Sequence, residues 1–408
     1  MRIFDLVGRS VVAEGELVRA VLDRTVGSEH WTLQSDDPLE VFSSVLAAFL
    51  SGRKLTILDR FVEQSNLPER DLGSEPCDRS LRFEREAIST IEEILEGVSM
   101  NGSDGSITLL TSGTTGKPTV VEHGISTLLK GVKIGEDYQR KCWGLAFNPS
   151  HIAGIQVFLQ AVWNDSDLVQ LFGVDPHIAV QRIQDRRISH LSATPSYFRL
   201  LLPSLESVGP ISGVQRVTCG GEKFDPILGE RLKEFFPNAR INNIYASTEG
   251  GTLLVSQSDR FRIPDSQARD FRVLDGRLQF RMQTSTNFLG REWYDSGDRV
   301  EVLQENPLEF RFIGREADNV SVGGYNVNVS AVEDVLLSHP AVAQGRVYAR
   351  KNSLLGNVLV AEYVATKVDV SEKEMRAFFV ERVEQHEVPR KIDKVDHLKL
   401  SRSGKIER

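Results

Sequence analysis

Residues 109–118 read Leu109-Leu110-Thr111-Ser112-Gly113-Thr114-Thr115-Gly116-Lys117-Pro118. They follow a predicted strand, Ile107 to Leu110, and combine two glycines, four hydroxyl side chains and one lysine within seven residues. Glycines let the backbone approach an anion closely, and their exposed N–H groups can donate hydrogen bonds to it. The hydroxyls add donors and the lysine adds positive charge. This composition predicts a loop that holds a triphosphate.

The loop is not a Walker A motif. That motif places glycine five residues before the glycine of Gly-Lys, and serine or threonine after the lysine. Here those positions hold Thr111 and Pro118, and Pro118 has no N–H to donate. A P-loop kinase is therefore disfavoured. The alternative is a polar surface loop without a ligand.

Composition excludes several classes of protein. The 408 residues are 40% hydrophobic and 26% charged, as in ordinary globular proteins, and the formal net charge of -8 argues against nucleic acid as main partner. The three cysteines form no CxxC pair, so a disulfide scaffold and a zinc cluster are disfavoured. The apolar stretch Val41 to Leu50 is too short to span a bilayer. No signal peptide is apparent, so we expect a cytoplasmic protein without a membrane span.

The order of predicted elements indicates an α/β fold. Strands alternate with helices from about residue 105 to 250, as in a layered α/β sheet. After residue 260 short strands prevail, with a hairpin turn at Asp275-Gly276. From residue 318 the order is strand, helix, strand, strand, helix, strand. Capping boxes at Ser330 with Glu333 and at Ser371 with Glu374 predict the starts of both helices.

Further stretches rich in glycine, hydroxyl and charged residues follow the loop. They are Asn148-Pro149-Ser150-His151-Ile152-Ala153-Gly154, Val217-Thr218-Cys219-Gly220-Gly221-Glu222, Ile244-Tyr245-Ala246-Ser247-Thr248-Glu249, Tyr294-Asp295-Ser296-Gly297-Asp298, Phe312-Ile313-Gly314-Arg315-Glu316-Ala317-Asp318-Asn319, Ser321-Val322-Gly323-Gly324-Tyr325 and Ser401-Arg402-Ser403-Gly404-Lys405-Ile406-Glu407-Arg408. In this order they resemble the motifs of adenylate-forming enzymes. That superfamily includes acyl- and aryl-CoA synthetases, peptide synthetase adenylation domains and luciferases. The resemblance covers about residues 105 to 408.

The resemblance implies a two-domain architecture. A large layered α/β N-terminal domain, residues 1–316, would bind ATP and the acid, and a small mobile α+β lid, residues 317–408, would carry the catalytic lysine. The chain before the glycine-rich loop is short, as in the compact o-succinylbenzoate-CoA synthetases. The hinge would be Ala317 or Asp318.

The resemblance also implies roles for individual residues. The ATP phosphates would be held by Thr111, Ser112, Gly113, Thr114, Thr115, Gly116 and Lys117, and the adenine and its surroundings by Gly220, Gly221, Glu222, Tyr245 and Ala246. Asp298 would accept both ribose hydroxyls, Arg315 would contact ribose or phosphate, and Thr248 the α-phosphate. Glu249 would bind Mg²⁺, which takes carboxylate, phosphate and water oxygens. Lys405 would bridge the acid and the α-phosphate.

The acid and thiol sites follow from the same resemblance. The carboxylic acid pocket would be lined by His151, Gly154, Ala246 and Ser247. The motif from Asn148 to Gly154 contains no aspartate that could hold the ammonium group of an amino acid. Ala246 replaces the family's usual glycine. Gly323 and Gly324 would let a pantetheine arm pass.

The implied reaction has two steps. A carboxylate attacks the α-phosphorus of ATP to give an acyl-adenylate and pyrophosphate, and a thiol then displaces AMP. The acceptor is expected to be CoA, with carrier-protein phosphopantetheine as the alternative. A basic rim at Arg346, Arg350 and Lys351 would favour CoA, unless these side chains form only a solvated face. A third hypothesis is a nucleotide-binding scaffold with weak turnover, which the residues Ala246, Ala317 and Ser321 favour.

Overall fold

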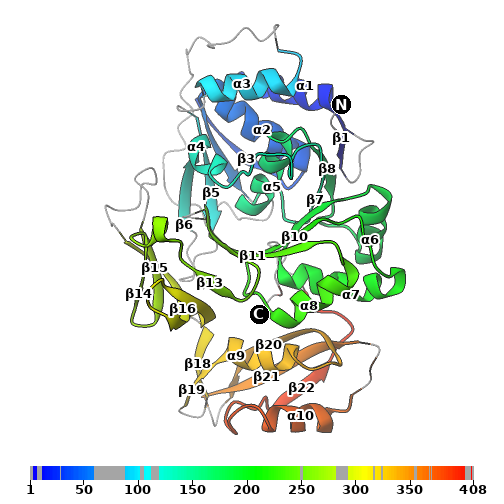
Figure 1. Cartoon of the computed structure of the whole chain (residues 1–408), viewed down its shortest axis with the longest axis vertical. Coiled ribbons are helices and arrows are strands. Elements are labelled where there is room, and N and C mark those ends of the chain that lie inside the picture. Colours follow the sequence, from blue (N-terminus) through cyan, green and yellow to red (C-terminus); the bar gives the residue numbers. More distant parts are fainter. Residues whose placement is uncertain are drawn as a thin grey trace.

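The structure, a computed structural model, describes residues 3–6, 12–27, 29–58, 88–101, 105–111, 119–248, 251–281, 293–315, 318–322, 325–352, 356–366, 368, 370–399 and 406. Its elements form a larger lobe and a smaller lobe (Figure 1). The described residues up to Arg315 build three sheets, and those from Asp318 onward build the smaller lobe. The predicted fold, a large α/β unit followed by a small α+β unit, is confirmed. The domain division at residue 316 stays a prediction, because Glu316 and Ala317 lie outside the described residues.

The largest sheet has the strand order β12-β11-β10-β9-β7-β8-β1-β2. Its strands are β1 (Ile3–Asp5), β2 (Val12–Ala13), β7 (Cys142–Leu145), β8 (Asp167–Gln170), β9 (His190–Ala193), β10 (Arg216–Gly220), β11 (Arg240–Ser247) and β12 (Gly251–Ser256). The six inner strands are parallel and the two edge strands antiparallel. Parallel strands need helical crossovers, which here are α5 (Ile152–Val162), α6 (Pro176–Asp185), α7 (Pro195–Val208) and α8 (Pro226–Phe235).

Local sequence explains where three of these helices begin. Asp175, Thr194 and Asp225 each stand before a proline and accept a hydrogen bond from a backbone N–H of the first turn. Proline fits the first helical position because its missing N–H would have no partner there. The local sequence therefore defines the residue at which each of these three helices begins.

Strand β1 is held at its place by charge. The buried Asp5 carboxylate pairs with Arg182 Nη2 at 2.8 Å and with Arg186 Nε at 2.6 Å, both from α6. Arg182 also donates to the Asp5 carbonyl oxygen at 2.9 Å. These contacts tie the first described strand to a helix some 180 residues later.

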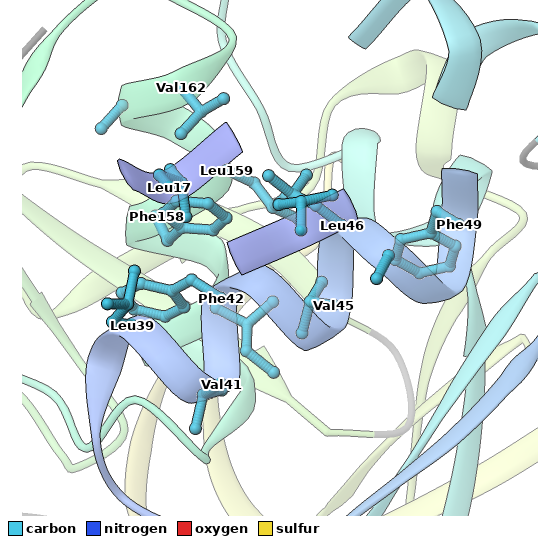
Figure 2. Close-up of a cluster of buried hydrophobic side chains, with 14 of the residues drawn as sticks. Leu17, Leu39, Val41, Phe42, Val45, Leu46, Phe49, Phe158, Leu159 and Val162 are labelled. Carbon is cyan, nitrogen blue, oxygen red and sulfur yellow. The ribbon is translucent and has the colours of Figure 1, made fainter. Parts of the chain in front are cut away.

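A second sheet, of order β3-β4-β5-β6, packs against the same core. It comprises β3 (His30–Gln34), β4 (Lys54–Leu58), β5 (Ser106–Thr111) and β6 (Thr119–Gly124), with α1 (Glu14–Arg24), α2 (Pro38–Ser51), α3 (Ile91–Asn101) and α4 (Ile125–Leu129) nearby. Helix α2 contains the apolar stretch noted in the sequence and is buried on all sides (Figure 2). Phe42 of α2 stacks on Phe158 of α5 with ring centroids 4.2 Å apart. The stretch is therefore a core helix, and none of the helices in the described ranges has the length and apolarity to cross a bilayer.

The third sheet is antiparallel, of order β13-β17-β16-β15-β14. Its strands are β13 (Arg260–Arg262), β14 (Phe271–Leu274), β15 (Arg277–Arg281), β16 (Trp293–Gln304) and β17 (Glu309–Arg315). Asp275 and Gly276 join β14 to β15 with φ of 51° and 73°. Two consecutive positive φ angles are typical of a two-residue type I′ hairpin, so the predicted turn is confirmed.

The smaller lobe contains β18 (Asn319–Val322), β19 (Tyr325–Asn328), α9 (Val329–Leu337), β20 (Val342–Asn352), β21 (Gly356–Ala365), α10 (Glu372–Val380) and β22 (Lys391–Lys394). Ser371 and Glu374 form the predicted capping box of α10. The other predicted capping box is wrong. Helix α9 begins two residues earlier, with Asn328 accepting from Ala331 N, and a β18–β19 hairpin precedes it.

The two residues of the failed box have other partners. Ser330 Oγ donates to Asp318 Oδ2 at 2.5 Å, and Glu333 Oε2 accepts from Val347 N at 3.0 Å. Both therefore make tertiary contacts instead of closing the helix start.

Candidate functional site

Predicted nucleotide residues meet at the carboxyl edge of the large sheet. Gly220 ends β10, Ser247 ends β11, and the two strands are parallel neighbours with Gly220 opposite Ile244. Ligands of open α/β sheets bind outside the carboxyl ends of the strands. The sequence motifs are therefore brought to the edge where such a site is expected.

Asp298 is the centre of the described site. Its carboxylate accepts from the Tyr245 hydroxyl at Oδ2, at 2.8 Å, and from Arg315 Nε at Oδ1, at 2.9 Å. The Asp298 side chain is 10% exposed, and Asp298 and Arg315 are directly paired residues of β16 and β17. Three of the predicted nucleotide residues, far apart in sequence, are thus in direct contact.

The two donors of this cluster have shifted pKa values. Burial and the neighbouring carboxylate raise the pKa of Tyr245 above its ordinary value, so its hydroxyl stays a proton donor. Burial lowers the pKa of Arg315, but the Asp298 carboxylate outweighs it and the net shift is upward. A carboxylate held by two such donors has the charge-assisted hydrogen-bonding capacity that a ribose diol requires.

A small pocket adjoins the Tyr245 ring. Phe312 lies 4.5 Å and Phe261 6.4 Å from the Tyr245 centroid. The pocket is lined by Glu222, Lys223, Phe224, Asn243, Ile244, Tyr245, Asp259, Phe261 and Phe312. Flat aromatic side chains with a polar rim suit a heterocyclic base.

Several of these lining residues do not appear among the sequence predictions. Asn243 stands two positions before Tyr245 on β11, so strand alternation places both on one face. Lys223 directly follows the predicted Glu222. Phe312 opens the motif that contains Arg315, whereas only their tertiary placement reveals Asp259 and Phe261.

The three predicted residues at the end of β10, Gly220, Gly221 and Glu222, differ in what determines their conformation. Gly221 has φ of 82°, which favours glycine whatever surrounds it. A Cβ at Gly220 would meet only Ile244 atoms, at 3.7 Å or more, so protein packing leaves space there. Glu222 lines the pocket, but its carboxylate accepts from Ser196 N at 2.9 Å and Ser196 Oγ at 3.0 Å. Glu222 therefore fixes the start of α7 as well as bordering the pocket.

The predicted acid-pocket residues lie at the start of α5 and at the end of β11. His151 is the residue before α5 and makes no side-chain capping bond. A Cβ on Gly154 would lie 2.2 Å from the Asn148 carbonyl oxygen, so this glycine is required for the loop to approach α5. Ala246 and Ser247 follow Tyr245 on β11, where a bulge interrupts pairing with β12. Thr248 comes next and is half-buried.

The hinge region is held by Asp318. Its Oδ2 accepts from Arg315 N at 3.3 Å and from Ser330 Oγ at 2.5 Å. Gly314 has φ of 145°, and a Cβ there would lie 2.9 Å from Asn328 Nδ2. The choice between Ala317 and Asp318 as pivot stays open, because Ala317 lies outside the described residues.

Other predicted residues also fall outside the described ranges. They are Ser112, Gly113, Thr114, Thr115, Gly116 and Lys117 of the loop, Glu249, Gly323, Gly324 and Lys405, together with the side chain of Thr111. Within the described ranges, no group of three His, Cys, Asp or Glu side chains is arranged to hold a metal. The roles predicted for these residues stay predictions.

The predicted basic rim is reduced to two residues. Arg346 donates from Nε and Nη2 to Glu362 Oε2, at 2.9 and 2.7 Å, and is therefore engaged within the β20–β21 hairpin. Arg350 and Lys351 are exposed near the end of this hairpin. Asn357, paired with Lys351, donates from Nδ2 to the Ser321 carbonyl oxygen at 2.8 Å, so the hairpin end lies beside β18.

Comparisons with known proteins identify relatives of the chain. The chain is 24% identical to tyrocidine synthase 3 of Brevibacillus parabrevis over 75% of this chain and 5% of that protein. It is 25% identical to acetyl-coenzyme A synthetase of Bacillus subtilis over 76% of this chain and 61% of that protein. The chain thus spans a small part of tyrocidine synthase 3 and under two thirds of acetyl-coenzyme A synthetase.

Solved structures show the same fold. The o-succinylbenzoate CoA synthetase of Bacillus subtilis, in complex with its acyl-adenylate intermediate, superposes with a TM-score of 0.69 at 20% identity, covering 99% of this chain and 94% of that one. A family model described as AMP-binding enzyme C-terminal domain matches residues 331–405. The model described as AMP-binding enzyme matches residues 40–272, more than half of the chain. The chain therefore belongs to the family of AMP-binding, adenylate-forming enzymes.

Proposed function

We propose that the protein is an ATP-dependent acid–thiol ligase that activates a carboxylic acid as acyl-AMP and transfers the acyl group to CoA. The observation that carries the proposal is the buried Asp298 carboxylate, bound by Tyr245 and Arg315 beside an aromatic pocket. This arrangement joins an acceptor for ribose hydroxyls to a surface for a base. The family membership and the ATP- and magnesium-bound structure of the Bacillus subtilis synthetase support ATP and Mg²⁺ as its partners.

In the first step, a carboxylate oxygen of the acid attacks the α-phosphorus of ATP. The bond from that phosphorus to the bridging oxygen breaks, and pyrophosphate leaves. A carboxylic acid with a pKa near 4 to 5 is already ionised at pH 7, so this step needs no general base. The protein must place two anions in line and neutralise their repulsion. We assign this to the glycine-rich loop with Lys117, to Thr248, to Glu249 through magnesium, and to Lys405.

In the second step, a thiolate attacks the acyl carbonyl carbon. The carbon–oxygen bond to AMP breaks, AMP leaves, and the thiol proton passes to solvent. We assign the thiol path to Gly323 and Gly324. The exposed Arg350 and Lys351, on a hairpin end tied to β18, favour CoA because it carries phosphates that cations can pair with.

A carrier-protein phosphopantetheine is the second candidate acceptor. The match to tyrocidine synthase 3 over three quarters of the chain favours it. The two acceptors share the pantetheine thiol. They differ in what surrounds that thiol, so residues outside the adenylation site select the acceptor.

We also propose a cytoplasmic location for this reaction, because ATP and CoA are available there.

The test is carboxylate-dependent pyrophosphate release with ATP and magnesium. Fatty, aryl and amino acids would each be tried with and without CoA, for the wild type and for Lys405→Ala. We expect release with one acid class, thioester only with CoA, and a loss of about 10²–10³ in rate for Lys405→Ala. Adenylate that accumulates despite CoA would favour the carrier-protein acceptor. ATP binding without release for any acid would overturn the ligase in favour of the scaffold.

A further inference from the structure

Helix α9 is linked to the larger lobe through two polar side chains one turn apart, one of them directly and the other through Asp318. Ser330 and Asp334 are four residues apart, so they lie on the same face of the helix. Ser330 Oγ donates to Asp318 Oδ2 at 2.5 Å, and Lys223 Nζ donates to Asp334 Oδ2. Figure 1 shows α9 on the side of the smaller lobe that faces the larger lobe, with α10 on the opposite side.

Both contacts lead to the nucleotide site. Asp318 also accepts from Arg315 N, and the same Arg315 donates through Nε to Asp298. Lys223 borders the pocket that Tyr245 and Phe312 line. A displacement of α9 therefore acts on both the ribose acceptor and the rim of the base pocket.

The charges around Asp334 make the lysine contact the decisive one. Burial raises the pKa of Asp334, and the neighbouring Asp225 carboxylate adds to that shift, whereas Lys223 and Arg199 oppose it. Arg199 is itself paired with Asp225. Lys223 is therefore the cation that compensates Asp334 directly. Without it, two carboxylates would share a single arginine at the contact between the lobes.

We propose that Asp334 is a positioning residue whose ion pair with Lys223 holds the smaller lobe in the arrangement of this structure. The pair thereby sets the ratio of the rates of the two half-reactions. The inference rests on the proposed function, because it needs two steps served by different domain arrangements. The Lys223 and Asp334 side chains are 36% and 45% exposed, so the pair is partly solvated. Partly solvated pairs shift an equilibrium by a few-fold, which is the size a reversible contact requires.

The first test compares the half-reactions in Asp334→Asn, Lys223→Met and the charge-exchanged double variant Lys223→Asp with Asp334→Lys. Carboxylate-dependent ATP–pyrophosphate exchange reports adenylation, and thioester formation from preformed adenylate reports transfer. We expect both single variants to shift the ratio of the two rates in one direction, by about three- to fivefold, and the double variant to restore it. A salt increase to 0.5 M should shift the wild type likewise and leave Asp334→Asn unchanged.

The matched control is Glu301→Gln with Arg311→Met. This pair is also half exposed, 45% on each side, but lies within the antiparallel sheet of the larger lobe. It should leave the ratio unchanged. Equal losses in both half-reactions, an unaltered ratio, or a double variant that resembles the single ones would overturn the proposal.

A second readout does not need activity. Fluorophores at Met100→Cys and Val380→Cys, 80% and 62% exposed in the wild type, report the distance between the lobes by energy transfer. Cys77 is replaced by serine, and burial raises the thiol pKa values of Cys142 and Cys219, so these label poorly. The distance distribution should broaden in Asp334→Asn and narrow again in the charge-exchanged variant.

The two readouts distinguish a failure of the proposed Lys223–Asp334 contact from a failure of the proposed function. If the wild type makes adenylate but the distance distribution is unchanged in Asp334→Asn, the proposed role of the ion pair is wrong and the ligase function still stands. If the wild type activates no acid but the distance distribution broadens in Asp334→Asn, the ligase function and the kinetic role of the ion pair are both wrong. The contact between the lobes then still stands.

Discussion

Asp298 and Arg315 face each other on the neighbouring strands β16 and β17, and Arg315 Nε donates to Asp298 Oδ1 at 2.9 Å. The arginine is the last described residue before the chain crosses to the smaller lobe. The proposed ribose acceptor is therefore bonded directly to the residue that leads into the predicted hinge.

Replacing Asp298 by asparagine should weaken nucleotide binding. The amide keeps the shape but loses the charge, and hydrogen bonds to charged groups contribute about 1.5–3 kcal/mol. We expect AMP affinity to fall by about 10- to 100-fold, measured by titration calorimetry. Glu301→Gln, an exposed carboxylate on the same strand, should bind AMP as the wild type does. Equal affinities for Asp298→Asn and the wild type would remove Asp298 from the site.

Replacing Tyr245 separates its hydroxyl from its ring. Tyr245→Phe removes the donor to Asp298 but keeps the ring against Phe312, so AMP affinity should change less than about tenfold. Tyr245→Ala also removes the aromatic surface, and the affinity should fall further, since aromatic contacts add about 0.5–1.5 kcal/mol beyond buried area. If both variants lost the same affinity, stacking on the ring would be excluded as a source of binding energy.

Two glycines near helix starts should respond oppositely to alanine. In Gly154→Ala the new Cβ would lie 2.2 Å from the Asn148 carbonyl oxygen, so the loop with His151 must move. We expect unfolding free energy to drop by about 1–3 kcal/mol and the KM for the acid to rise. In Gly15→Ala of α1 nothing lies within 4 Å of the new Cβ, and stability should rise by about 0.5 kcal/mol. Urea unfolding of both variants is the measurement, and a Gly154→Ala protein as stable as the wild type would contradict the packing argument.

Two buried histidines should weaken the fold in mild acid. Burial lowers the pKa of His123 and of His190 to about 4, from an ordinary value of 6.5. The unfolded chain therefore binds these protons more tightly than the folded one. Stability is complete above pH 6.5 and falls as pH drops toward 4, by about 2 kcal/mol per histidine at pH 5.

The measurement is unfolding free energy at pH 7 and pH 5 for the wild type, His123→Gln and His190→Gln. Each variant should lose less stability between the two pH values than the wild type, whatever its stability at pH 7. Parallel losses in all three proteins would assign the acid sensitivity to other groups.

Local sequence predicted those parts of the fold that local chemistry specifies. The turn at Asp275-Gly276 needs two positive φ angles, and Ser371 with Glu374 satisfies its own helix start. The box at Ser330 and Glu333 failed because Asn328 is an equally good cap two residues earlier. Its serine then bonds to Asp318, a partner that spacing along the chain does not reveal.

The site was predictable as a set of motifs but not as an arrangement. The resemblance named Tyr245, Asp298 and Arg315 separately, and their contact depends on how an antiparallel sheet meets the parallel one. Asp259 and Phe261 border the pocket although nothing in their neighbourhood of sequence marks them. Arg346 shows the converse, because Glu362, sixteen residues later, engages the cation that sequence alone left available.

Strand β1 imposes an order on assembly during synthesis. It pairs with β8 through Phe4 opposite Leu168, and the carboxylate of its Asp5 pairs with two arginines of α6. That side of the large sheet therefore stays incomplete until α6, about 180 residues after β1, has been synthesised, since long-range contacts form only once both partners exist. Until α5 has also been synthesised, the apolar helix α2 lacks the cover that α5 provides in their shared core cluster, so the nascent chain exposes an apolar surface prone to aggregation.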